Sequence, residues 1–249
     1  MASIPQLVER AQEYMNELPP LLDPPQMPLG KEVAGWIDHT NLHPDATPEH
    51  IADLCAEARE YGFAAVCVNP VYVPLASRQL QGSEVEVCTV AGFPLGASLS
   101  AVKALEASTS MDGGASEVDM VLNIGALKGG DYQAVLKDLQ IMAEVVHTQG
   151  AILKVIIENA LLEKSEKIIA CLLAREAGAD FVKTSTGFSS GGAVVDDVAL
   201  MYRVVGPEVK VKAAGGIGSW EKAREMIQAG ASRIGASSGI AILKGALQG

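Results

Sequence analysis

Short apolar runs alternate with longer amphipathic stretches along most of this chain. The short runs are rich in β-branched residues, which is typical of buried strands. We predict eight strands, over residues 35–39, 63–69, 85–91, 116–123, 151–158, 180–184, 209–213 and 232–236. The stretches between and after them carry apolar residues at helical spacing and predict helices over 48–60, 71–80, 99–111, 131–148, 163–177, 194–204, 219–228 and 238–247.

This alternation predicts an α/β fold, a single (β/α)₈ TIM barrel, because eight strand–helix units fit a chain of 249 residues. An open, doubly wound sheet is the alternative, but it more often has fewer strands and an early glycine fingerprint. No GxGxxG motif follows the first predicted strand. In a barrel, functional residues lie at the carboxyl ends of the strands.

The N-terminal segment precedes the strand–helix repeat. Residues 4–18 carry apolar side chains at helical spacing, and Pro19 and Pro20 end the predicted helix. We therefore divide the chain into an N-terminal helix with a Pro-rich connector, residues 1–30, and a barrel domain, residues 31–249.

Composition narrows the class of partner. The hydrophobic fraction of 49% is ample for a core, and the net charge of −11 argues against nucleic acid or an anionic membrane as partner. A phosphorylated small molecule stays compatible, because backbone N–H groups bind phosphate locally. The four cysteines lack CxxC spacing and no signal-peptide pattern begins the chain, so we expect free thiols and a cytoplasmic location.

Two lysines carry the strongest chemical signal. Lys183 and Lys212 each lie where a β-branched run gives way to small residues, on consecutive predicted strands. A lysine inside an apolar strand is unfavourable unless it is paired or neutral. Two such lysines are expected to lower each other's pKa, and a neutral amine attacks carbonyl carbons. The pattern predicts an enzyme that forms a Schiff base.

Acidic residues accompany these lysines. Alternation along residues 116–123 places Glu117, Asp119 and Asn123 on one face, which we expect to point into the barrel. Asp119 is then either a structural ion-pair partner of the lysines or a carboxylate that transfers protons and orients water. Lys154 and Glu158 share a face of the next strand, where an internal salt bridge and catalysis are both open readings.

Other reactive side chains have simpler interpretations. Cys67 is expected to face inward as a packing thiol near the site, because no histidine base accompanies it. His39 and His43 have the spacing of a helical metal pair, but His39 ends a strand and Pro44 follows His43. We therefore expect no metal site. Lys210 lies at the entrance of its strand and is expected to meet solvent.

Two small-residue loops follow the last two strands. Gly215 and Gly216 follow one strand, and Gly235, Ser237 and Ser238 end and follow the next. Barrel enzymes frequently bind phosphate between these two loops, where glycine admits the anion and a helix N-terminus favours it. We predict a phosphate site there, although two tight turns are the structural alternative.

Taken together, the predicted strand ends resemble the deoxyribose-phosphate aldolase family from about Val33 onward. The matching stretches are Ile37-Asp38-His39-Thr40, Ala65-Val66-Cys67-Val68, Gly92-Phe93-Pro94-Leu95-Gly96, Glu117-Val118-Asp119-Met120-Val121, Lys154-Val155-Ile156-Ile157-Glu158, Val182-Lys183-Thr184-Ser185-Thr186-Gly187, Lys212-Ala213-Ala214-Gly215-Gly216 and Gly235-Ala236-Ser237-Ser238. The sequence departs from the family pattern at His43, Asn159 and, relative to some members, Phe188.

The resemblance implies a class I aldolase that needs no cofactor. It implies reversible cleavage of 2-deoxy-D-ribose 5-phosphate to glyceraldehyde 3-phosphate and acetaldehyde, in deoxyribose catabolism. Lys183 would form the imine, Lys212 would perturb the pKa of Lys183, and Asp119 would relay protons. Substrate contacts are expected from Asp38, Thr40, Cys67, Lys154, Thr186, Gly187, Gly215, Gly216, Gly235, Ser237 and Ser238. A homodimer or higher homo-oligomer is expected.

Three other functions share parts of this pattern. Another imine-forming barrel, such as a different sugar-phosphate aldolase or a transaldolase, would keep the lysine and the phosphate loops. A barrel isomerase or synthase would bind phosphate without an imine. A non-catalytic sugar-phosphate binder would keep the loops but would not need Asp119 or Lys212.

Overall fold

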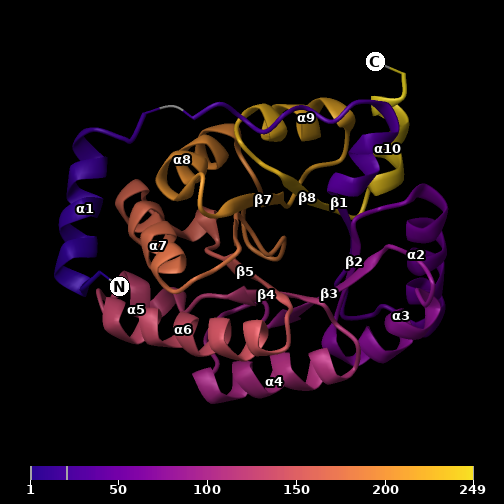
Figure 1. The fold of residues 1–249 in the computed structure, drawn as a ribbon, viewed down its shortest axis with the longest axis horizontal. Helices are drawn as coiled ribbons and strands as arrows, with labels where there is room; N and C mark the ends of the chain where they lie inside the picture. Colours follow the sequence, from indigo (N-terminus) through magenta and orange to yellow (C-terminus); the bar gives the residue numbers. More distant parts are fainter. Residues whose placement is uncertain (1, 21, 249) are drawn as a thin grey trace.

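The chain forms a closed barrel of eight parallel strands surrounded by helices (Figure 1). The computed structural model describes residues 2–20 and 22–248. Each strand pairs with the next one in sequence, and β1 pairs with β8 to close the barrel. The strands are β1 Ile37–Asn41, β2 Ala65–Val68, β3 Glu86–Ala91, β4 Glu117–Val121, β5 Ile152–Ile156, β6 Phe181–Lys183, β7 Lys210–Ala214 and β8 Arg233–Ala236.

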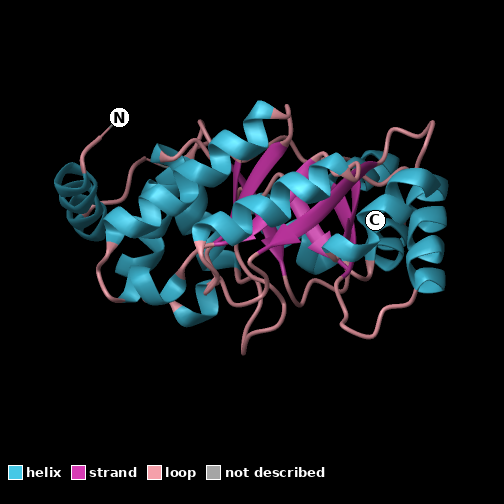
Figure 2. Ribbon diagram, turned by 90° about the horizontal axis from the view of Figure 1, so that it is seen from below, coloured by secondary structure: helices cyan, strands magenta, loops and turns pink. Residues whose placement is uncertain are grey.

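Helices cover the outside of the strands, as the side view shows (Figure 2). The α-helices are α1 Ile4–Asn16, α2 Pro48–Tyr61, α3 Val73–Gln79, α4 Ser100–Asp112, α5 Ile124–Lys128, α6 Tyr132–Thr148, α7 Lys164–Glu176, α8 Val195–Val205, α9 Trp220–Gln228 and α10 Gly239–Ala246. Three 3₁₀ turns lie between them, η1 Gly30–Trp36, η2 Pro70–Tyr72 and η3 Asn159–Leu161. No helix in the described part of the chain has the length and apolar character needed to cross a membrane.

The predicted (β/α)₈ barrel and all eight predicted strands are confirmed, with small differences at the ends. The first strand begins at Ile37, because residues 30–36 form the turn η1. The N-terminal helix ends at Asn16, just before Pro19 and Pro20. The short helix α5 was not predicted; the side chain of Asn123 caps it by accepting a hydrogen bond from Ala126 N at 3.1 Å.

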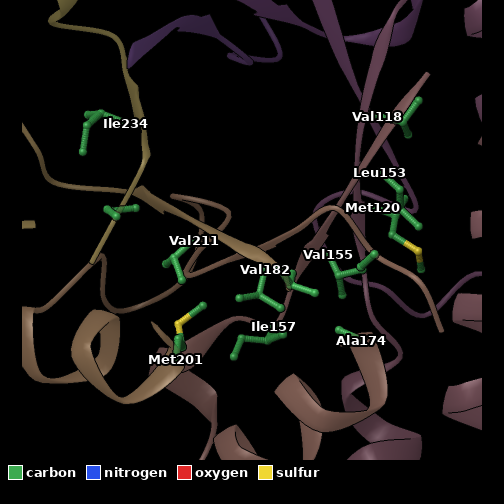
Figure 3. Close-up of a cluster of buried hydrophobic side chains, with 14 of the residues drawn as sticks. Val118, Met120, Leu153, Val155, Ile157, Ala174, Val182, Met201, Val211 and Ile234 are labelled. Carbon is green, nitrogen blue, oxygen red and sulfur yellow. The ribbon is translucent and has the colours of Figure 1, made fainter. Parts of the chain in front are cut away.

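Side chains alternate along each strand, so one set faces the surrounding helices and the other faces the inside of the barrel. Outward-facing side chains such as Val118, Met120 and Val155 pack against the helices in one large apolar core (Figure 3). Full burial of an aliphatic side chain contributes about 1.5–3 kcal/mol, so this layer supplies most of the stabilisation. The inward-facing residues include a second, smaller apolar cluster, Leu42, Ala65, Cys67, Cys88 and Val90. The remaining inward positions hold charged side chains together with apolar ones such as Val121 and Ile156.

The N-terminal extension lies along the outside of the barrel. Helix α1 packs beside α7, and the connector then passes α8 and α9 to reach η1 beside α10 (Figure 1). Arg203 Nε on α8 donates a hydrogen bond to Pro19 O at 2.8 Å, and Tyr202 Oη donates one to Asp23 O at 2.7 Å. These contacts tie the extension to the barrel; the division into domains at residue 30 stays a prediction.

Candidate active site

Strand register brings the predicted site residues together inside the barrel. Lys183 on β6 and Lys212 on β7 are paired positions in adjacent strands, and Asp119 on β4 pairs with Lys154 on β5. Because side chains alternate along a strand, these four all point inward while their neighbours face the helices. The pairing register of β4 with β5 and of β6 with β7 therefore sets the relative positions of these four side chains.

Asp119 lies at the centre of this constellation. Its Oδ2 atom accepts hydrogen bonds from Lys183 Nζ and from Lys212 Nζ, both at 2.7 Å. Its Oδ1 atom accepts from Lys154 Nζ at 2.9 Å and from the Cys88 thiol at 3.2 Å. Asp119 is completely buried, so every one of these interactions is made away from bulk water.

Further charged groups complete the network beneath Asp119. Lys212 also pairs with Asp38, and Arg233 Nη1 donates to Asp38 Oδ1 at 2.6 Å. Lys154 Nζ donates to Glu117 Oε2 at 2.6 Å. The network therefore holds four basic side chains, Lys154, Lys183, Lys212 and Arg233, against the three acidic side chains Asp38, Glu117 and Asp119.

The pKa values follow from burial and from these partners. Burial acts to raise the pKa of Asp119, but Lys154, Lys183 and Lys212 overcome it and hold that pKa well below its ordinary value. Burial acts to lower the pKa of Lys212, but Asp119 and Asp38 overcome it and raise that pKa. Asp119 is therefore a carboxylate and Lys212 an ammonium near neutral pH. The prediction that the two lysines lower each other's pKa is wrong for Lys212, because two carboxylates contact it.

A cavity of about 400 Å³ opens at the carboxyl ends of the strands above this network. Lys183 lines the cavity, whereas Lys154 and Lys212 are fully buried and do not line it. Eight of the predicted contact residues line it: Thr40, Thr186, Gly187, Gly215, Gly216, Gly235, Ser237 and Ser238. His43 and Phe188, which were not predicted to contact substrate, line it as well. Asp38, Cys67 and Lys154, also predicted to contact substrate, are buried outside the cavity lining.

The two predicted phosphate loops follow adjacent strands, and both line this cavity. Gly215 and Gly216 have φ values of +92° and +74°, a left-handed backbone that favours glycine. Ser238 immediately precedes the first residue of α10. The helix N-terminus therefore lies at the cavity wall, where its free N–H groups and its dipole favour an anion.

The two inward thiols lie beside the charged network. A hydrogen bond with Cys88 lowers the pKa of the Cys67 thiol below its ordinary value, and Lys212 adds to this effect although burial opposes it. Cys67, Cys88 and Asp119 have side-chain atoms within 4.8 Å of one another, close enough to share a cation. Lysine ammonium groups already contact Asp119, so we interpret the cluster as an ion-paired network and not as a metal centre.

The other charged residues singled out on β5 and β7 are Lys154, Glu158 and Lys210. Lys154 pairs with Glu117 and Asp119, so it belongs to an internal layer of ion pairs, which was one of the two readings left open for this strand. Glu158 bonds Thr186. Lys210 is exposed, as predicted, and its Nζ lies 5.6 Å from the centre of the Phe181 ring.

The two histidines considered as a metal pair lie in different surroundings. His39 Nε2 lies 2.6 Å from Glu57 Oε2 on α2, whereas His43 lines the cavity. Arg233 was missed, although it shares strand parity with Gly235, which the sequence placed beside the cavity. Because residues two apart on a strand face the same side, this parity could have predicted that Arg233 points into the barrel.

Comparison with known proteins agrees with this geometry. The model of the DeoC/LacD aldolase family matches residues 33–249. This chain belongs to that family. It is 57% identical over 220 residues to a deoxyribose-phosphate aldolase from Thermococcus gammatolerans, covering 88% of this chain and 98% of that relative.

Solved structures agree as well. A crystal structure of a protein from Coccidioides immitis, described as a putative deoxyribose-phosphate aldolase, superposes with a TM-score of 0.91 at 41% identity, covering 98% of this chain and 97% of that one. A tetrameric deoxyribose phosphate aldolase from Aeropyrum pernix superposes with a TM-score of 0.82 at 32% identity, again covering 98% and 97%. The similarity to both therefore includes the N-terminal extension.

Proposed function

We propose that this family member cleaves 2-deoxy-D-ribose 5-phosphate reversibly to D-glyceraldehyde 3-phosphate and acetaldehyde through a Schiff base on Lys183. One observation carries the proposal. Of the three lysines that contact Asp119, Lys183 is the one whose side chain lines the cavity. The two relatives described as deoxyribose-phosphate aldolases, from Thermococcus gammatolerans and Aeropyrum pernix, agree with this substrate.

The charge balance of the buried network distinguishes Lys183 from the other three basic side chains. Asp38, Glu117 and Asp119 carry three negative charges, which balance the positive charges of Lys154, Lys212 and Arg233. A fourth buried cation would be left without its own counter-charge, which is unfavourable in a buried site. Lys183 is also the lysine of this network that lines the cavity, where its nitrogen can reach the carbonyl carbon of a substrate.

In the cleavage direction, the Lys183 nitrogen attacks the C1 aldehyde of the open-chain sugar. Loss of water gives a protonated imine, and Asp119 assists by accepting and returning protons at the Lys183 nitrogen, 2.7 Å away. A base removes the C3 hydroxyl proton, the C2–C3 bonding electrons move into the iminium, and glyceraldehyde 3-phosphate leaves. Protonation of the enamine at C2 and addition of water then release acetaldehyde and regenerate the amine.

We assign the 5-phosphate to the part of the cavity between the β7 and β8 loops. The residues of the β7 and β8 loops that line the cavity carry no positive charge. The backbone N–H groups, the hydroxyls of Ser237 and Ser238 and the α10 dipole would therefore hold the anion. Thr40, Thr186 and Gly187 line the same cavity and are proposed to contact the sugar. Asp38, Cys67 and Lys154 would act indirectly, through the network around Asp119.

We also propose a homo-oligomer, on the precedent of the tetrameric relative, and a cytoplasmic location, because the four cysteines are free thiols. Neither partner nucleic acid nor a membrane surface is expected for a chain of net charge −11.

The direct test is an assay of the purified protein with 2-deoxyribose 5-phosphate, in which both aldehyde products are measured. We expect equal amounts of acetaldehyde and glyceraldehyde 3-phosphate, and no products from Lys183→Met. An isomerase would convert the sugar without releasing a two-carbon aldehyde, and a binding protein would leave it unchanged. Either result would overturn the proposal.

A further inference from the structure

Glu158 has an unusual backbone conformation where the chain leaves β5. Its φ of +55° makes it the single non-glycine residue with positive φ among the residues that the structure describes. This left-handed conformation is unfavourable for residues with a β-carbon and persists only where surrounding contacts hold it. The Glu158 side chain is buried, with 2% of its surface exposed.

The Glu158 carboxylate binds the loop that follows β6. Its Oε2 atom accepts hydrogen bonds from Thr186 N, at 3.1 Å, and from the Thr186 hydroxyl. The same hydroxyl oxygen accepts a hydrogen bond from Phe188 N at 3.0 Å. Glu158 therefore holds the backbone at Thr186 directly and at Phe188 through one intermediate.

This loop forms a wall of the cavity that contains Lys183. Thr186, Gly187 and Phe188 all line the cavity, whereas Glu158 does not. The half-exposed Phe188 ring meets the ring of Phe93 edge-on, with centroids 5.3 Å apart and planes at 86°. The hydrogen bonds that Glu158 accepts thus hold the loop that places an aromatic wall beside the cavity containing Lys183.

We propose that Glu158 is a positioning residue for substrate binding, acting through Thr186 to fix the cavity wall formed by residues 186–188. The role rests on the proposed function, because it assigns this wall to the sugar-phosphate substrate. Glu158 makes no contact with the reacting atoms. Loss of its hydrogen bonds loosens the wall and weakens substrate binding, and it leaves the Lys183 chemistry intact.

Two matched pairs of variants separate this role from others. Glu158→Gln keeps an acceptor oxygen of the same reach, whereas Glu158→Met keeps the length and removes the acceptor. Thr186→Ser keeps the hydroxyl, whereas Thr186→Val removes it and keeps the shape. We expect Glu158→Met to raise KM by about fivefold to tenfold with little change in kcat, and Glu158→Gln to stay close to wild type. Thr186 itself lines the cavity, so Thr186→Val should raise KM at least as much, and Thr186→Ser should raise it less.

In the double variant Glu158→Met, Thr186→Val the losses should be less than additive, because both single variants remove the hydrogen bond from the Thr186 hydroxyl to Glu158 Oε2. A large loss of kcat in Glu158→Gln would instead mean that the carboxylate takes part in proton transfer. Equal effects of Gln and Met, or full additivity in the double variant, would mean a general packing role. Either result overturns the proposal.

Hydrogen exchange provides a readout that does not depend on catalysis. The backbone amides of Thr186 and Phe188 should exchange faster in Glu158→Met than in wild type, and at the wild-type rate in Glu158→Gln. Unchanged exchange in Glu158→Met would overturn the positioning role. If the exchange result holds while wild type fails to cleave 2-deoxyribose 5-phosphate, the proposed substrate is wrong and the Glu158–Thr186 connection stands.

Discussion

Lys183 and Lys212 donate hydrogen bonds to the same oxygen atom, Oδ2 of Asp119, each at 2.7 Å. Two amines that share one carboxylate oxygen compete for its negative charge. Lys212 has a second carboxylate partner in Asp38 and stays an ammonium, whereas Lys183 faces the cavity. A fixed positive charge beside Lys183 disfavours a second one at the same place.

This relationship predicts a pH-dependent effect of Lys212→Met. Without the Lys212 ammonium, no fixed positive charge opposes a second one beside Asp119 Oδ2. Activity should fall most at neutral pH and recover partly as the pH is raised, because the neutral amine is the nucleophile. The measurement is the pH profile of kcat/KM.

Lys154→Met is the matched control, because Lys154 also contacts Asp119 but through Oδ1, at 2.9 Å. Its profile should move less than that of Lys212→Met. Profiles of the two variants that are scaled down without any displacement along the pH axis would contradict the assigned role of Lys212.

The role of Asp119 can be separated from simple ion pairing. Asp119→Asn keeps the shape but removes the charge that accepts protons, and we expect a loss of kcat of about 10²–10⁴. Glu117→Gln is the control, since Glu117 belongs to the same buried network and bonds Lys154 rather than Lys183. Turnover and thermal unfolding should be measured for both.

We expect both variants to lose stability, because each leaves buried cations with fewer partners, and Asp119→Asn alone to lose most of its turnover. Similar turnover in the two variants would assign Asp119 a structural role.

The phosphate assignment predicts selective effects at Ser238, at the start of α10. Ser238→Asp places a negative charge at the proposed anion site and should raise KM for 2-deoxyribose 5-phosphate at least about tenfold. The same change should affect unphosphorylated 2-deoxyribose much less. Ser238→Asn has the same shape without the charge and controls for size.

Ser238 is a sharper position for this test than Gly216. Nothing lies within 4 Å of a β-carbon built at Gly216, but its φ of +74° means that valine there would strain the backbone. Equal losses with both substrates in Ser238→Asp would place the phosphate elsewhere in the cavity.

Local patterns in the sequence were sufficient to predict the barrel and the inward face of β4. The short strand-like runs between helical segments predicted every strand, and alternation correctly separated Glu117 and Asp119 from Val118 and Met120, which join the outer core. Small-residue loops after the last two strands correctly indicated where a cavity lies. These features depend on neighbours within a few residues.

Contacts between distant strands could not be read in this way. Nothing local shows that Asp38 reaches Lys212, which reversed the expected direction of the Lys212 pKa. The pairing of Glu158 with Thr186 depends on a left-handed backbone at Glu158. The sequence does not indicate this conformation, because the position is not a glycine. The ranking of Lys183 over Lys212 came from family resemblance; the structure adds a geometric reason, because Lys183 lines the cavity.

The central claim is that Lys183 forms the imine, and trapping tests it most directly. The protein is incubated with acetaldehyde and borohydride, which reduces an imine to a stable secondary amine, and then analysed by intact-mass and peptide mass spectrometry. We expect one two-carbon adduct per chain, on the peptide containing Lys183, and none in Lys183→Met. An adduct on Lys212, or no adduct on wild-type protein, would contradict that claim.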